Sequence, residues 1–209
     1  MNKIKFSKIE IRDLIKAWLA ISVAFALIFT PGRLDTLLTT NITIFATNLV
    51  LSAITVGSAF LLHELGHKFV AQHYGCYAEF RADNFMLFLA LVMAIVLKIV
   101  FAAPGAVMIG GRISKERNGK ISMAGPATNL ILAILFLIPA LIFSQGFLGI
   151  LFHLGFLVNV WIGLFNLIPL WVLDGKKILS WNKLVYFTML AIGIFLFIIN
   201  YFLPLQPLF

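Results

Sequence analysis

The chain has 209 residues, of which 62% are hydrophobic and 11% are charged. Soluble domains are nearer half apolar and a quarter charged, so this composition argues against a soluble protein and indicates an integral membrane protein. A net charge of +8 would suggest nucleic acid as the partner of a soluble chain. Here the basic residues cluster at the ends of apolar segments, as is typical of cytoplasmic loops, and we expect no nucleic-acid partner.

Apolar segments alternate with short polar stretches along the chain. A helix needs roughly 20 apolar residues to span a membrane, and its backbone groups must be satisfied within the segment. The apolar segments cover residues 14–30, 42–74, 85–103, 121–143, 147–173 and 184–203. They predict an all-α polytopic membrane protein, a bundle of about five to six transmembrane helices. We expect one membrane-embedded domain over residues 1–209 and no separate soluble domain.

The first apolar segment follows a strongly basic N-terminus. The basic residues are Lys3, Lys5, Lys8, Arg12 and Lys16. A signal peptide begins in the same way, but the apolar run continues past Ala24–Ala26 without a good cleavage site, so we expect an uncleaved first span. The positive charge predicts a cytoplasmic N-terminus. We expect a multi-pass protein of the cell membrane, in contact with the lipid bilayer.

The third apolar segment, residues 85–103, is predicted to enter the membrane and return, or to lie at its surface. If it crossed fully, the basic residues of 112–120 would lie outside the cell, against the charge rule. The alternative is a true span followed by a return half-span at 104–111. Residues 103–120 contain four glycines and the turn signal Asn118–Gly119, which predict a loop or short hairpin at the membrane surface.

The second apolar segment contains the stretch AFLLHELGHKFVAQ, residues 59–72. His63 and His67 are four residues apart, so a helix places both imidazoles on one face, where they can bind one metal ion. Glu64 lies about 100° around the helix from His63, within reach of a water molecule at that ion. The pattern H-E-x-x-H supplies two zinc ligands and a general base.

The helix face that carries the histidines is small or polar. Steps of three or four residues back from His63 reach Ala59, Thr55, Ser52 and Asn48. Because small and hydroxyl residues mark helix interfaces in membranes, we expect this face to point into the bundle. These polar residues could simply hold helices together, but three ionisable groups at metal spacing are costly in a bilayer and favour metal binding.

A catalytic zinc ion takes three protein ligands and keeps one position for water. The third ligand must come from outside the H-E-x-x-H stretch. The candidates are His73, His153, Glu79, Asp83 and Asp174. Asp174 is favoured because Pro169 breaks the preceding helix and Asp174–Gly175 forms a turn signal, which lets a carboxylate turn back toward a buried ion. A salt bridge with Arg81 or solvation accounts more simply for Glu79 and Asp83.

Three motifs resemble those of the site-2 protease family of intramembrane zinc metalloproteases. They are HELGH at 63–67, GPATN at 125–129 and NLIPLWVLDG at 166–175. The resemblance covers a core of about residues 40–180. Two positions depart from the family pattern, because Val172 replaces a proline and Lys176 replaces a frequent glycine.

The resemblance implies a function as well as a fold. The zinc ligands of one catalytic ion would be His63, His67 and Asp174, the catalytic base Glu64, and the substrate-binding residues Asn166 and Asn129. The implied reaction is hydrolysis of peptide bonds within or near transmembrane segments of membrane proteins or signal-peptide remnants. An edge strand at 104–113 could hold the unwound substrate by strand addition.

Two other functions remain open from the sequence. A metal-ion or proton transporter also uses intramembrane His and Asp residues, but it does not specially require Glu64 between the histidines. A catalytically inactive relative is disfavoured because the predicted base is intact. The oligomeric state and the identity of the substrate do not follow from the sequence.

Overall fold

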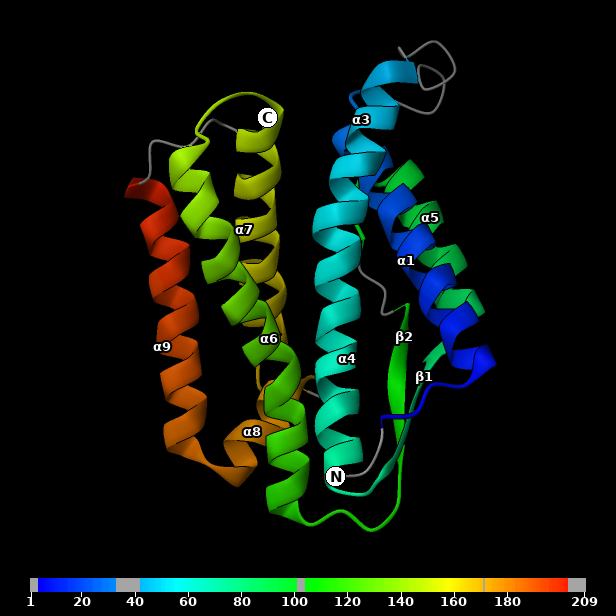
Figure 1. Cartoon of the computed structure of the whole chain (residues 1–209), viewed down its shortest axis with the longest axis vertical. Coiled ribbons are helices and arrows are strands. Elements are labelled where there is room, and N and C mark those ends of the chain that lie inside the picture. The colour runs from blue at the N-terminus through cyan, green and yellow to red at the C-terminus, as the bar shows by residue number, and fades with distance from the viewer. Residues whose placement is uncertain (1–3, 33–41, 101–103, 171, 203–209) are drawn as a thin grey trace.

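Helices make up 77% of the structure, a computed structural model that describes residues 4–32, 42–100, 104–170 and 172–202 (Figure 1). The helices are α1 (Lys8–Phe29), α3 (Ile42–Ser52), α4 (Ser58–His73), α5 (Asn84–Val96), α6 (Lys115–Ile142), α7 (Gly146–Asn166), α8 (Asp174–Trp181) and α9 (Lys183–Ile199). A π-helical segment, η1 (Ala53–Gly57), joins α3 to α4, and a 3-10 turn, η2 (Asn200–Phe202), follows α9. The predicted all-α polytopic fold is confirmed.

Four helical stretches of the described chain are long and apolar enough to cross a membrane. They are Ile42–His73, Lys115–Ile142, Gly146–Asn166 and Lys183–Phe202. Each of them coincides with an apolar segment predicted from the sequence. The predicted first span, residues 14–30, corresponds to the 22-residue helix α1, which is not among these four and carries the buried carboxylates of Glu10 and Asp13 near its start. The described residues therefore contain four such helices, fewer than the five to six predicted.

Helix α4 lies between two groups of elements (Figure 1). On one side, α6 packs against α4 and is itself packed with α7, α8 and α9 around a buried apolar core. On the other side, α1, α5 and a small sheet pack together around Leu14, Phe80 and Leu87. Residues on opposite faces of α4 therefore contact different parts of the molecule.

The sheet consists of two antiparallel strands, β1 (Tyr77–Ala82) and β2 (Gly105–Gly110). Phe80 of β1 lies opposite Val107 of β2. Helix α5 and the residues after it connect the two strands. The Asp83 N–H donates to the Pro104 carbonyl at 3.1 Å, so the connection begins and ends at the same place.

The prediction that residues 85–103 enter the membrane and return stays a prediction, and residues 101–103 lie outside the described part of the chain. The 13 residues of α5 extend about 20 Å, which is short of the roughly 30 Å hydrocarbon core. Lys98 is the one basic residue of this segment. Its ammonium group donates hydrogen bonds to the carbonyl oxygens of Leu27 and Thr30 at 2.6 and 3.1 Å. The lysine therefore caps the C-terminal end of α1, where a cation is favourable.

The hairpin predicted around Asn118–Gly119 is wrong. Both residues lie in the first turns of α6, which begins after Ser114, whose hydroxyl accepts the Arg117 N–H at 3.3 Å as an N-cap. A Cβ at position 119 would lie 2.4 Å from the Trp181 Cβ. The glycine therefore serves close helix packing rather than a turn, and β2 pairs with the more distant β1 instead.

Candidate metal centre

The two histidines of the H-E-x-x-H stretch lie on the buried face of α4 that is packed against α6. His63 is 3% exposed and His67 is 9% exposed, and their Nε2 atoms are 3.1 Å apart. Ala59, Thr55 and Ser52, which continue the predicted stripe, are fully buried, and Asn48 at its far end is half-buried. The prediction that this face points into the bundle is confirmed.

Asp174 is brought to the histidines by the irregular chain between α7 and α8. Helix α7 ends at Asn166, shortly before Pro169, and Asp174 begins α8. A Cβ on Gly175 would lie 2.1 Å from the Leu167 carbonyl oxygen, so only a glycine lets α8 start this close to the end of α7. As a result, the Asp174 Oδ2 lies 3.3 Å from His63 Nε2 and 3.1 Å from His67 Nε2.

The three side chains form a group that could hold one metal ion. Zinc with nitrogen and oxygen ligands at about 2.0–2.1 Å in a tetrahedron has ligand atoms roughly 3.3 Å apart. The observed separations are 3.1, 3.1 and 3.3 Å, so the donor set and its spacing fit zinc. Asp174 would supply the oxygen ligand and the two imidazoles the nitrogen ligands.

Hydrogen bonds behind the imidazoles set which nitrogens face the centre. His63 Nδ1 lies 2.5 Å from the Asn129 side-chain oxygen, and His67 Nδ1 lies 2.8 Å from the Ile121 carbonyl oxygen. Both partners are acceptors, so each Nδ1 carries the hydrogen and each Nε2 presents a lone pair. Such outer partners orient metal-binding histidines and raise their basicity.

Asn129 is fully buried in α6, and its amide is oriented by further partners. Its nitrogen donates to the Ala59 carbonyl at 3.2 Å and to the Asn159 side-chain oxygen at 2.9 Å. The substrate-binding role predicted for Asn129 stays a prediction. The structure gives it another one, which is to hold His63 in position.

We expect Asn129→Leu to lower the affinity for zinc by roughly 10- to 100-fold, the cost usual for loss of such an outer partner. The leucine keeps the volume but leaves the His63 Nδ1–H without its acceptor. The measurement is a zinc titration of the purified protein. Asn159→Ala is the control, since it removes a contact of Asn129 but none of His63. Equal zinc affinity in both variants would contradict the positioning role.

Glu64 is 9% exposed and points toward the sheet. Its Oε2 accepts the Val107 N–H at 3.0 Å, so β2 lies against the predicted base. Sequence reasoning missed this contact, because it joins residues 43 positions apart.

Gly125, the first residue of GPATN, faces the two imidazoles. A Cβ there would lie 2.4 Å from His67 Nε2 and 2.5 Å from His63 Nε2. The missing side chain thus leaves space where the lone pairs converge. Gly125 and Asn129 are four residues apart, so a helix places them on the same face. This spacing in the sequence could have indicated that both residues face the histidines.

The other candidate residues have different surroundings. The Glu79 carboxylate is bound by the hydroxyls of Ser7 and Tyr77 and by Arg81, at 2.9 Å, which confirms the expected Arg81 salt bridge. Asp83 caps α5, and His153 Nε2 lies 2.8 Å from the Asn200 side-chain oxygen.

The predicted substrate role of Asn166 stays a prediction. Its side chain donates to the Ile162 carbonyl at 3.0 Å, within α7.

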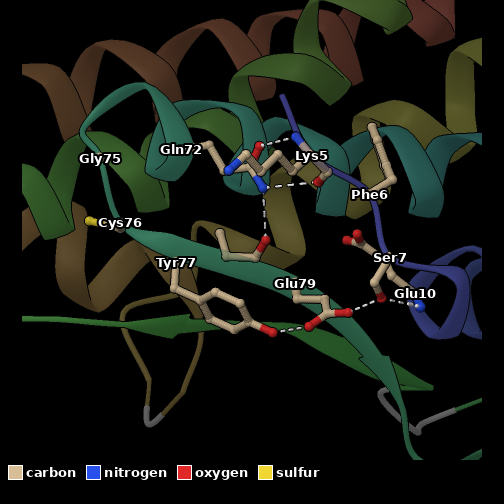
Figure 2. Close-up of a pocket in the computed structure, with 10 residues that line it drawn as sticks. Lys5, Phe6, Ser7, Glu10, Gln72, Gly75, Cys76, Tyr77 and Glu79 are labelled. Carbon is tan, nitrogen blue, oxygen red and sulfur yellow. Dashed lines mark hydrogen bonds between the residues drawn. The ribbon is translucent and has the colours of Figure 1, made fainter. Parts of the chain in front are cut away.

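A cavity of about 740 Å³ lies elsewhere, between the N-terminal segment and β1 (Figure 2). Its lining includes Lys5, Ser7, Gln72 and Glu79 but none of the residues of the metal centre. The Gln72 amide of α4 is bonded to Lys5 and to the Ala78 carbonyl of β1, and the Glu79 carboxylate of β1 accepts the Ser7 hydroxyl. The cavity therefore lies along the outer edge of β1, away from the metal centre.

The chain is similar to two proteins of the archaeon Methanocaldococcus jannaschii. One, named "Putative zinc metalloprotease", is 39% identical over 191 residues, which are 89% of this chain and 91% of that protein. The other, named "Zinc metalloprotease", is 35% identical over 121 residues, which are 57% of this chain and 30% of that protein. No family profile matches the chain, and no solved structure matches it.

Proposed function

Because the chain belongs to the same family of zinc metalloproteases as its archaeal relatives, we propose that it is an intramembrane protease of the site-2 type. It hydrolyses peptide bonds within or near the transmembrane segments of membrane proteins or signal-peptide remnants. The observation that carries the proposal is that Asp174 converges on His63 and His67, which belong to a helix of span length and composition.

Zinc is the cofactor, and one ion suits this group of residues. We assign its binding to His63, His67 and Asp174. When bound, zinc would supply a Lewis acid and lower the pKa of a water molecule toward about 7. The side chains of the protein supply the proton transfer and hold the substrate.

Glu64 is assigned as the general base and acid. Its carboxylate follows His63 directly in α4 and is held by the Val107 N–H. It accepts the proton of the attacking water and passes it to the nitrogen of the leaving amine. A metal-ion or proton transporter would hydrolyse no peptide bond, so peptide-bond cleavage separates the two functions.

The edge of β2 that faces away from β1 is the proposed binding place of the substrate. In an antiparallel pair, residues alternate between facing the partner strand and facing away. The Asp83–Pro104 bond and the Val107–Glu64 bond place residues 105, 107 and 109 with their backbone groups directed away from β1. An unwound substrate segment can pair with this edge by strand addition beside Glu64.

We expect a strong chelator to abolish peptide-bond cleavage by the purified protein in detergent, and added zinc to restore it. The substrate would be a labelled transmembrane peptide, and the products would be identified by mass spectrometry. Cleavage that survives complete metal removal would overturn the enzyme mechanism. Bound zinc without any cleavage would favour a transporter.

The proposed orientation places the N-terminus and the start of α6 in the cytoplasm. Ser114 and Asn118 are both exposed there, close to several basic residues that favour the cytoplasmic side. In a Cys76→Ser background, cysteines at either position should react with a membrane-impermeant thiol reagent only after the cells are permeabilised. Ready labelling of intact cells would reverse the orientation.

A further inference from the structure

A fully buried ion pair joins the metal-binding helix to α1. Lys68 directly follows His67 in α4, and its ammonium group is bound to Oε2 of Glu10. Both residues are 0% exposed. The ammonium also lies 3.8 Å from the centre of the Phe6 ring, which is a favourable place for a cation.

The second oxygen of Glu10 reaches the sheet. Its Oε1 accepts the Phe80 N–H of β1 at 2.9 Å. Phe80 lies opposite Val107 of β2, whose N–H is bound by Glu64. These contacts form a closed circuit: Lys68 of α4 binds Glu10, Glu10 binds β1, β1 pairs with β2, and β2 binds Glu64 of α4. Glu64 lies one helical turn before Lys68.

The circuit fixes the sheet at both of its outer edges. Facing residues of the two strands each donate an outward N–H to a carboxylate, Phe80 to Glu10 and Val107 to Glu64. Asp13, one turn after Glu10 in α1, also accepts the Ala82 N–H, at 3.4 Å. At Phe80 and Ala82 the outer edge of β1 therefore lies against α1, whereas the cavity of Figure 2 lies beside residues 77–79 of the same edge.

We propose that Glu10 is a positioning residue for proteolysis, and that Lys68 holds its carboxylate in place. Glu10 tethers β1, and through it β2, at the distance from α4 that brings the outward edge of β2 to Glu64. It also occupies the outward N–H of Phe80, so that group of β1 is not available to a substrate strand. The inference rests on the proposed function, since the sheet edge matters only where a substrate segment binds.

A buried ion pair gains little over a well-packed apolar pair, whereas loss of one partner leaves an unpaired charge. This asymmetry makes single substitutions poor tests. Two double variants avoid it, Glu10→Gln/Lys68→Met and Glu10→Leu/Lys68→Met. Both remove the two charges together, and only the glutamine keeps an acceptor for the Phe80 N–H.

Both double variants should fold and bind one zinc ion per chain. The glutamine variant should keep kcat/KM for a transmembrane peptide within a few-fold of the unaltered protein. The leucine variant should lose about tenfold or more, because small misplacements of a substrate site have effects of this size, and the loss should fall mainly on KM. Glu116→Gln/Lys120→Met is the matched control at an exposed ion pair and should leave kcat/KM unchanged.

Hydrogen exchange of the backbone amides of residues 105–110, measured by mass spectrometry, is the second readout. It should be faster in the leucine variant than in the glutamine variant. Equal kcat/KM and equal exchange in the two double variants would overturn the proposal. If the leucine variant does not fold, a large loss of activity in the glutamine variant with unchanged exchange in β2 would also overturn it.

The exchange readout does not depend on catalysis. If the unaltered protein showed no metal-dependent cleavage, the proposed function would fail. Faster exchange in the leucine variant would still support the tether between Glu10 and the sheet.

Discussion

Glu64→Gln is expected to keep bound zinc and to lose most of its turnover, whereas His67→Ala and Asp174→Ala are expected to lose both. The amide of glutamine can still accept the Val107 N–H, so the local structure should persist. It cannot accept and pass on the proton, and a general base contributes roughly 10²–10⁴-fold to the rate. Removal of a ligand instead leaves two of the three converging atoms, too few for a stable zinc site.

The measurements are metal content by atomic emission and cleavage rate of a transmembrane peptide. Glu116→Gln is the control carboxylate, because Glu116 is exposed on α6 and pairs only with Lys120 among the contacts described. Stoichiometric zinc together with normal activity in Asp174→Ala would remove Asp174 as the third ligand. Glu79 and Asp83 would then be tested, although their present partners make either one a less suitable donor.

Gly125→Ala should abolish zinc binding and cleavage while the protein stays folded. The added Cβ would lie within 2.4 and 2.5 Å of the two Nε2 atoms, far inside van der Waals contact. The rings cannot easily turn away, because the Nδ1 atoms are held by Asn129 and by the Ile121 carbonyl. The methyl group therefore occupies the space where the metal ligands converge.

Gly163→Ala in α7 is the matched control, since its Cβ would have its nearest neighbours at an ordinary 3.5 Å. Alanine is favoured over glycine in a helix by about 1 kcal/mol, so this variant should retain zinc and be at least as stable. Zinc titration and thermal unfolding of both variants distinguish local obstruction from general destabilisation. Normal zinc affinity in Gly125→Ala would show that the space beside the histidines is not needed.

The sequence alone predicted the features that depend on neighbouring residues. Apolar length indicates membrane helices, and the spacing of His63 and His67 places two imidazoles on one helix face. The same local reasoning failed at Asn118–Gly119, because the glycine is required by Trp181, 62 residues later. A turn dipeptide carries no information about a distant packing partner.

The tertiary structure decided which distant groups act together. Asp174 was a reasoned choice among five residues, and only the fold places its oxygen 3.1 and 3.3 Å from the two imidazoles. The sequence proposed Asn129 for the substrate, but the packing of α6 against α4 turns its amide toward His63. The strand pairing that brings Val107 to Glu64 likewise joins separate parts of the chain. Local periodicity determines which face a residue occupies, whereas contacts across the fold depend on how whole elements pack.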